Sequence, residues 1–503
     1  MKRFSCALLA ALLLTVSLTG CAGRTASSAP EPDMIITEGS VLSRPETESL
    51  PQGSGETPPA QASLPELSQE SEPPQASLKE SSSASQSSAS SQTVSSVSSA
   101  ASSEKSSASS AQVSSMSASS AQSSSSQATP PSGEGSFAGQ EYRAVWYSYL
   151  DLSGMLQGQS QSAFRSSIRA AFSRSAGMGC NTAIVQVRPF ADALYPSQYF
   201  PWSYICTGTE GVDPGFDPLQ VMIEEAHSLG MKIEAWINPY RIRTSGSKYG
   251  LSADNPASLW EESGNDYVIR DGGIYYNPGR AEVRKLIING VKEIVENYEV
   301  DGIHFDDYFY PDPDESFDSQ AYADYKAGGG TLSLGSWRRE NVNILVRDTY
   351  SAVKAIDPSV RFGVSPQANN DINYEQQYID VDTWLSVPGY VDYICPQIYY
   401  GFDNATCPYE ETVALWDHKI KVSGIDLYVG LAPYKIGLVD SWAGTGKNEW
   451  VNDQQILARQ VLSAREYSNY GGFALFRYAS LFAPDSSVKN RVEKERNALA
   501  DLL

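Results

Sequence analysis

Histidine and cysteine are scarce in this chain, which has three histidines and six cysteines among 503 residues. None of the cysteines lies in a CxxC pair or at the Cys/His spacing of a zinc site. The sequence also lacks a glycine-rich phosphate loop, a Ser-His-Asp order and a zinc-enzyme motif. We therefore expect no metal site and no cofactor.

Basic residues are also few, because 37 Lys and Arg face 59 Asp and Glu, a formal net charge of −22. Such a charge argues against nucleic acid as a partner. It equally argues against adhesion to an anionic membrane surface through charge.

Aromatic residues are nearly absent from about Ala22 to Gly135, a stretch of Ser, Ala, Gln, Pro and Glu. Its centre, from Ser81 to Gln127, is almost pure Ser, Ala and Gln. Such a composition cannot bury enough apolar surface to offset chain entropy. We expect a disordered Ser-rich linker over residues 21–138.

The N-terminus combines Lys2 and Arg3 with the apolar run Ala7 to Leu18, which is typical of a secretory signal peptide over residues 1–20. The segment Leu18-Thr19-Gly20-Cys21 resembles the lipobox of bacterial lipoproteins. That resemblance implies lipidation of Cys21 and attachment to the extracytoplasmic face of a bacterial cell membrane. The alternative is plain secretion, with cleavage near the same place.

Residues 139–503 are expected to form the folded domain. Short apolar runs alternate there with helical stretches, which is typical of a parallel sheet wrapped by helices. Eight strands can be placed in order, so we predict an α/β TIM (β/α)8 barrel with long βα loops. Its cysteines are expected to be buried free thiols: Cys180, Cys206, Cys395 and Cys407.

The stretch Val300 to Pro311 is a short buried strand that runs into an acidic, aromatic loop. Ile303 and Phe305 share one phase of its period-two alternation, and His304 and Asp306 share the other. Asp306 therefore lies at the carboxyl end of the strand and points inward, where barrel enzymes place catalytic carboxylates. The alternative is a structural carboxylate bonded to Arg188 or to backbone amides.

A polar, aromatic-lined pocket of this kind suits a sugar, whose ring faces stack on aromatics while its hydroxyls need amides and charged groups. The strands at 182–188 and 232–239 repeat the layout of apolar residues outward and polar residues inward. The rim also holds aromatics that core packing would explain equally well, Tyr195 and Tyr478 among them. The predicted substrate-binding residues are Gln186, Arg188, Trp236, Asn238, His304, Tyr308, Gln397 and Tyr399.

Glycoside hydrolysis normally needs a second carboxyl group. Asp307 is adjacent to Asp306 and is our predicted catalytic partner, with Asp192 as a further candidate. Glu234 lies about 13 Å deeper along its strand, at ~3.3 Å per residue. That depth favours a buried partner of Arg188 or Lys232. The acidic loop Asp312 to Asp318 lacks the spacing of an EF-hand and is interpreted as solvated.

Several stretches, in order along the domain, resemble the bacterial glycosyl-hydrolase-like family 10. They are Gln186-Val187-Arg188, Tyr195-Pro196-Ser197, Pro201-Trp202, Asp217-Pro218-Leu219, Ala235 to Arg241, Tyr276-Asn277-Pro278, Asp301 to Pro311 and Pro396 to Tyr399. The resemblance implies a TIM-barrel glycosidase without a cofactor, found in envelope lipoproteins. Similar proteins act on peptidoglycan glycan strands, including strands stripped of stem peptides.

The segment Asp301 to Asp306 is also similar to the fourth-strand motif of the alpha-amylase superfamily, whose last Asp is the nucleophile. The amylase acid is a Glu that ends strand five, and here that strand is Phe362-Gly363-Val364-Ser365. The resemblance therefore supplies no general acid and leaves retention and inversion open. The leading hypothesis is a membrane-anchored glycoside hydrolase acting on peptidoglycan glycan. The alternatives are a catalytically inactive carbohydrate-binding lipoprotein and a transglycosylase.

Overall fold

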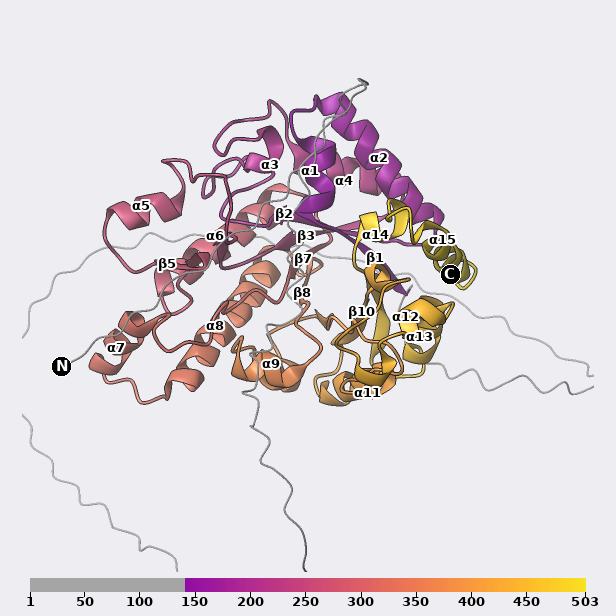
Figure 1. Ribbon diagram of the computed structural model, residues 1–503. Helices are drawn as coiled ribbons and strands as arrows, with labels where there is room; N and C mark the ends of the chain where they lie inside the picture. The colour runs from indigo at the N-terminus through magenta and orange to yellow at the C-terminus, as the bar shows by residue number, and fades with distance from the viewer. Residues whose placement is uncertain (1–140) are drawn as a thin grey trace, which may run out of the picture. The chain divides into compact units, whose positions relative to one another are not determined.

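The computed structural model describes residues 141–503, which contain a closed barrel of parallel strands (Figure 1). The expectations for the signal peptide, for Cys21 and for the linker lie outside the described residues. Around the barrel the order is β1-β11-β10-β9-β8-β7-β3-β2. The predicted (β/α)8 barrel is thus confirmed. Its strands are β1 (Tyr142–Tyr147), β2 (Thr182–Arg188), β3 (Lys232–Ile237), β7 (Gly302–Phe305), β8 (Arg361–Val364), β9 (Tyr393–Ile394), β10 (Asp426–Leu431) and β11 (Tyr470–Leu475).

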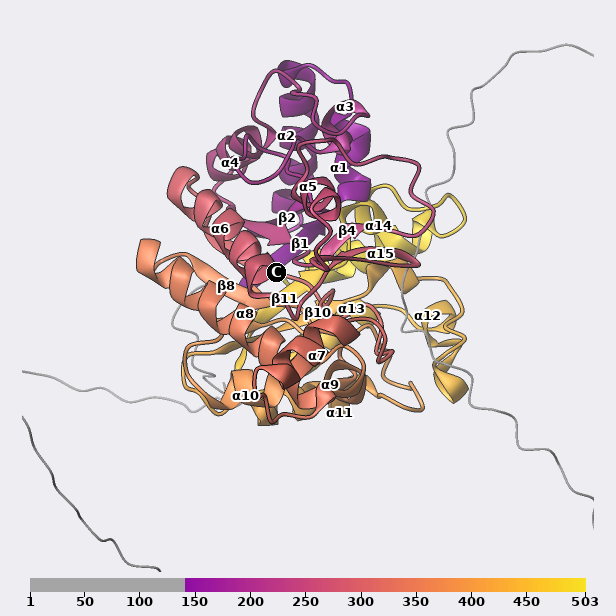
Figure 2. The same ribbon diagram turned by 90° about the vertical axis from the view of Figure 1, so that its left-hand side faces the viewer.

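Helices surround the strands, as Figures 1 and 2 show from two sides. Helix α4 begins as its sequence predicts, because the Asp217 side chain accepts a hydrogen bond from the Gln220 backbone N–H and Pro218 occupies the first turn. The helices between successive barrel strands, with one after the last, are α1 (Tyr149–Leu156), α2 (Gln161–Gly177), α4 (Pro218–Ser228), α6 (Ala281–Asn297), α8 (Leu334–Ile356), α10 (Val381–Ser386), α11 (Tyr409–Lys419), α13 (Ile456–Ala464) and α15 (Lys489–Ala500).

The alternation of each strand divides its side chains between two cores. The phase that holds Ile303 and Phe305 packs against the helices in one large apolar cluster. The other phase fills the barrel interior with a smaller cluster, which mixes aromatic and small side chains. Its members are Tyr142, Ala144, Trp146, Ile184, Trp236, Tyr393, Cys395, Tyr428 and Ala474. His304 faces the barrel interior, and Asp306, two residues later, has the same phase. Asp306 therefore lies between this inner cluster and the carboxyl-end mouth of the barrel.

The long βα loops carry structure that the sequence did not reveal. The loop after β3 contains an antiparallel sheet of β4 (Arg241–Arg243), β5 (Val268–Asp271) and β6 (Gly273–Tyr276). Short strands inside a loop give too few alternating positions to be recognised. The other inserted elements are α3 (Tyr204–Thr207), α5 (Pro256–Glu262), α7 (Ser319–Ala327), α9 (Asn370–Glu375), η1 (Pro433–Lys435), η2 (Gly444–Gly446), α12 (Glu449–Asn452) and α14 (Tyr478–Phe482).

The loop after β7 is less solvated than predicted. Asp318 is only 2% exposed, and the Arg338 guanidinium donates to its carboxylate at 2.6 Å. Because a buried charge needs a partner, this ion pair holds the loop against α8. The prediction of a solvated acidic loop is therefore wrong at Asp318 and holds for the exposed Asp314 and Glu315.

Two further expectations concern the same part of the chain. Cys180, Cys206, Cys395 and Cys407 are free thiols, the first three buried and Cys407 half-buried. Within residues 141–503, none of the helices combines the length and the apolar character that crossing a bilayer requires.

Candidate active site

Asp306 lies at the carboxyl end of β7 and is 3% exposed. The indole N–H of Trp236, on the neighbouring strand β3, donates to Asp306 Oδ2 at 3.2 Å. The backbone N–H of Tyr308 donates to Oδ1, also at 3.2 Å. Burial, and secondarily the charge of Asp307, raise the pKa of Asp306 to about 7. A carboxyl group in this state can hold or release a proton near neutral pH.

Asp307 is also buried, with 7% of its surface exposed. Burial raises the pKa of its carboxyl group, while hydrogen bonds from Gln397 and Gln377 act in the opposite direction. The amide of Gln397 is itself anchored, because its Nε2 donates to the carbonyl of Ser365 at 2.9 Å. The neighbouring carboxyl groups titrate as a pair, which favours a state with one proton between them.

Arg241 supplies the positive charge nearest to this pair, and it lowers the pKa of both carboxyl groups. Its Nε donates to the carbonyl of Pro189 at 3.2 Å. Its guanidinium lies over the Tyr308 ring, 4.3 Å from the centroid. We had not predicted Arg241 as a site residue. It lies in the inserted strand β4, which is not a barrel strand, so the alternation of the barrel strands does not predict where its side chains point.

His304 faces the barrel interior as predicted, but it is fully buried and its ring nitrogens are bonded to protein groups. Trp146 Nε1–H donates to Nε2 at 3.3 Å, and Ser365 Oγ lies 2.9 Å from the same nitrogen. Burial lowers the pKa of His304 to about 3, so the ring is neutral and Nδ1–H donates to Tyr393 Oη at 2.8 Å. The predicted substrate contact is therefore wrong, because the protein itself occupies both nitrogens.

Glu234 lies below His304, at the predicted depth but with a different partner. Its carboxyl group accepts a hydrogen bond of 2.5 Å from Tyr393 Oη, where the sequence suggested Arg188 or Lys232. Lys232 is exposed at the start of β3. Burial raises the pKa of Glu234 to about 7. Glu234 thus ends a buried hydrogen-bond chain and does not reach the mouth of the barrel.

The other acidic candidates are occupied by ion pairs. Asp192 is fully buried, and its carboxylate lies 3.3 Å from the Arg243 guanidinium, which also pairs with Glu210. The fifth barrel strand, β8, ends at Val364, one residue before the predicted end, and has no acid at its carboxyl end, as the sequence indicated. By contrast, the hydrogen-bond partners of Asp306 are neutral donors. Asp306 and Asp307 are therefore the acids best placed for chemistry.

Arg188 lies on the outer side of the barrel, so the prediction that it faces inward is wrong. The pairing of β2 with β3 shifts between Gln186 and Arg188, which breaks the alternation at the end of the strand. The guanidinium stacks on Phe200 at 3.9 Å from the ring centroid. A Cβ added at Gly290 in α6 would lie 2.3 Å from Arg188 Nη1, which places the side chain between β2 and α6.

Gly290→Ala is expected to destabilise the fold by about 1–3 kcal/mol, because the added methyl group would collide with Arg188 and Phe200. Chemical denaturation measures this change. Gly177→Ala in α2 is the control, since its methyl group meets nothing within 4 Å and should be neutral or gain up to ~1 kcal/mol. Equal stability of the two variants would contradict the packing of Arg188 and Phe200 against α6.

Two amides on adjacent strands support the site from one side. Gln186 is 1% exposed; its Nε2 donates to Asn238 Oδ1 at 2.6 Å, and its Oε1 accepts from the Tyr149 backbone N–H at 2.9 Å. The Gln186 amide is thus bonded to the protein through both of its polar atoms, and its predicted substrate contact stays a prediction. Asn238 Nδ2 has no hydrogen-bond partner among the described residues. Both of its N–H groups are therefore available to another molecule.

The half-buried aromatic residues gather on the opposite side of the carboxyl pair. The Tyr399 ring meets Tyr434 edge-on at 5.7 Å and lies 5.8 Å from Phe476. Burial raises the pKa of Tyr399, and the charges of Asp307 and Asp306 add to the rise. Tyr195 and Tyr478 are buried outside the barrel and belong to the core. Tyr399, Gln397 and Tyr308 keep partial exposure, as a substrate-binding role requires.

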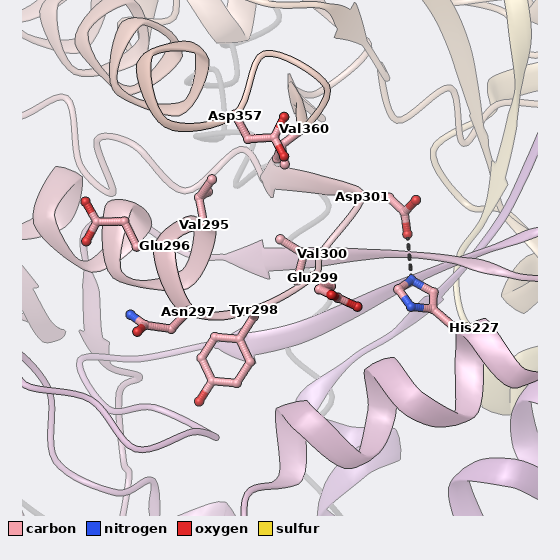
Figure 3. A pocket seen from close by; sticks show the side chains of 10 residues that line it. All are labelled: His227, Val295, Glu296, Asn297, Tyr298, Glu299, Val300, Asp301, Asp357 and Val360. Atoms are coloured by element: carbon pink, nitrogen blue, oxygen red, sulfur yellow. Dashed lines mark hydrogen bonds and ion pairs between the residues drawn. The ribbon is translucent and has the colours of Figure 1, made fainter.

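A cavity of about 440 Å³ opens at the other end of the barrel (Figure 3). Asp301, which precedes β7, faces His227 of α4 there at 3.1 Å. The remaining lining residues come from the end of α6 and the approach to β8. Since Asp306 follows the carboxyl end of β7, this cavity is separated from the carboxyl pair by the length of the strand.

Residues 141–445 match the model of the Glycosyl hydrolase-like 10 family. The chain belongs to this family. Glycosyl hydrolase YngK of Bacillus subtilis (strain 168) is 39% identical over 278 residues, which are 52% of this chain and 54% of that protein. Glycosyl hydrolase DigH of Escherichia coli (strain K12) is 37% identical over 283 residues, 52% of this chain and 64% of that protein. The chain thus spans between about half and two thirds of these relatives.

Among solved structures, the fold is similar to the glycoside hydrolase domain of PgaB (BpsB) from Bordetella bronchiseptica, with a TM-score of 0.48 and 14% identity. The likeness covers 72% of this chain and 99% of that domain. Membership of the Glycosyl hydrolase-like 10 family and the carboxyl pair at the barrel mouth are the two findings from which a function is proposed.

Proposed function

We propose that the protein is a glycoside hydrolase that cleaves peptidoglycan glycan strands with Asp306 and Asp307. The observation that carries this proposal is the buried carboxyl pair at the carboxyl end of β7, whose pKa values are both raised. With one carboxyl group protonated and the other ionised, the pair provides the acid and the carboxylate that glycoside hydrolysis needs. Paired acids at a strand end also favour an enzyme over a carbohydrate-binding protein.

Hydrogen bonds stabilise the ionised form of both acids, because Trp236 and the Tyr308 backbone N–H donate to Asp306 while Gln397 and Gln377 donate to Asp307. The resemblance of the segment Asp301 to Asp306 to the alpha-amylase motif favours Asp306 as the nucleophile or base, which leaves Asp307 as the acid that protonates the leaving oxygen. Arg241 offsets the negative charge of the pair, and Asn238 Nδ2, just after β3, is a donor without a partner among the described residues.

The substrate and the location are inferred from the sequence. The family resemblance favours peptidoglycan glycan, including strands freed of stem peptides. The signal peptide and the lipobox ending in Cys21 favour a lipid anchor on the extracytoplasmic face of the cell membrane. A lipid-anchored barrel at the end of a long linker would act on the wall outside that membrane.

Gln397→Met is expected to lower activity about 10- to 100-fold, because it removes a hydrogen bond to the Asp307 carboxyl group. Since this hydrogen bond lowers the Asp307 pKa, its loss should move the alkaline limb of the kcat/KM profile to higher pH. A pH–rate profile of the variant measures both effects. An unshifted profile would place Gln397 at the substrate and away from Asp307.

The proposal is tested on purified sacculi, intact and treated with amidase, using the full chain and the Asp306→Asn/Asp307→Asn double variant as control. Soluble glycan fragments released by the wild type alone are the expected result. Tight binding by both proteins with no release would reject the enzyme and favour the carbohydrate-binding lipoprotein. Release of fragments with non-hydrolysed, internally cyclised ends would favour the transglycosylase.

A further inference from the structure

A loop with exposed apolar side chains follows the carboxyl end of β10. Trp442 is 60% exposed, Val439 58% and Leu438 50%. Because every βα loop of a barrel lies at the carboxyl face, this loop shares the face of the candidate active site. Figure 2 shows α12, where the loop ends, projecting from the body on the side where β4 and α14 also lie.

A buried ion pair and two hydrogen bonds hold the loop in one conformation. Lys435 and Asp440 form an ion pair of 2.9 Å whose side chains are 10% and 2% exposed. The same aspartate accepts a hydrogen bond from the Trp442 backbone N–H at 3.2 Å. The Ala405 backbone N–H donates to the carbonyl of Ala443 at 3.1 Å, which ties the loop to its neighbour. The Trp442 ring is therefore presented to solvent by a fixed backbone.

The loop is continuous with the aromatic side of the carboxyl pair. It begins with η1, where Tyr434 contacts Tyr399 edge-on and lies 6.2 Å from Phe476. Tyr399 follows by two residues Gln397, whose side chain forms a hydrogen bond with the Asp307 carboxyl group. A chain-like ligand cleaved between the carboxyl groups could follow these rings outward along the loop to Trp442.

We propose that Trp442, flanked by Leu438 and Val439, is a distal platform that binds a sugar unit several residues away from the cleaved bond. The proposal rests on the proposed function and extends it to the length of strand that the enzyme prefers. A flat indole covers the apolar face of a pyranose ring, while the sugar hydroxyls stay in water. An exposed apolar group of this size beside an active site is typical of an interaction surface.

Trp442→Ala is expected to lower kcat/KM on long amidase-stripped strands about 5- to 20-fold, mainly through KM. Cleavage of a tetrasaccharide should not change, because the proposal places Trp442 beyond the sugar units of so short a ligand. Trp442→Phe should retain most of the activity on long strands. Leu462→Ser is the matched control, since this leucine is 51% exposed on α13, the outer helix between β10 and β11, and should leave both activities unaltered.

An equal effect of Trp442→Ala on long strands and on the tetrasaccharide would overturn the platform. So would Trp442-dependent binding to vesicles of anionic phospholipid with unchanged cleavage, which would assign the loop to a membrane surface. Co-sedimentation with stripped sacculi gives a readout without turnover. If the wild type cuts no substrate, weaker co-sedimentation of Trp442→Ala still supports the platform, and equal co-sedimentation refutes it.

Discussion

Asp306→Asn is expected to lower the rate of glycan cleavage by at least about 10³-fold, because it removes the carboxylate that acts as nucleophile or base. The substitution keeps the shape of the side chain. One of the two donors, Trp236 Nε1–H or the Tyr308 backbone N–H, can still meet the amide oxygen of the new residue, while the other faces its NH2 group. The loss should therefore appear in kcat, with the fold and substrate binding preserved. Release of soluble fragments from stripped sacculi measures the rate.

Co-sedimentation with sacculi is the control for binding, and circular dichroism is the control for the fold. Asp192→Asn is a useful contrast, because Asp192 is buried in an ion pair with Arg243 and should affect stability more than kcat. If Asp306→Asn kept more than a tenth of the wild-type rate, Asp306 would be a structural carboxylate. The catalytic centre would then have to lie elsewhere.

The second large effect concerns stability, since the Asp306 pKa is about 7 in the folded chain, above its ordinary value of 3.8. Between these two pH values the folded state binds more protons than the unfolded state, so the free energy of unfolding decreases as pH rises. Asp306→Asn removes this contribution. The variant should match the wild type near pH 4 and exceed it by up to about 4 kcal/mol above pH 7.

Urea denaturation across this pH range measures the difference between variant and wild type. Glu234, whose pKa is also raised to about 7, contributes the same slope to both proteins and cancels. Asp314→Asn is the control: this exposed carboxylate has a lowered pKa because Ser316 donates to it, so its loss should not stabilise the protein at any pH. If the difference in unfolding free energy between Asp306→Asn and the wild type did not vary with pH, burial would not raise the Asp306 pKa.

The alternation of apolar and polar residues was sufficient to predict the barrel. In each strand, one phase packs against the helices and the other faces the barrel interior. It placed β1 and β2 at the bounds that the structure has. It also placed Asp306 at the carboxyl end of β7. The weakest strand, β9, has only Tyr393 and Ile394 in its ladder, so a pattern of period two has almost nothing to act on.

The site was predicted less completely, for reasons that local sequence does not contain. Alternation fails where a strand ends in an irregular pairing, and Arg188 turned outward at such a point. The alternation predicts which way a side chain points, but it does not predict its hydrogen-bond partner. The hydrogen bond between Tyr393 and Glu234, for example, joins residues 159 positions apart in the sequence. Arg241 was not predicted because it lies on the inserted strand β4. The conformation of the loop after β3 brings its charge near the carboxyl pair, and the alternation of the barrel strands does not predict that conformation.

The central claim is that the carboxyl pair hydrolyses glycosidic bonds, and cleavage in water enriched in ¹⁸O tests it most directly. Amidase-stripped glycan strands are incubated with the full chain, and the products are weighed by mass spectrometry. We predict fragments that each carry a single ¹⁸O at the new reducing end, and no such fragments with Asp306→Asn. Products without ¹⁸O, or no products from the wild type, would contradict the account.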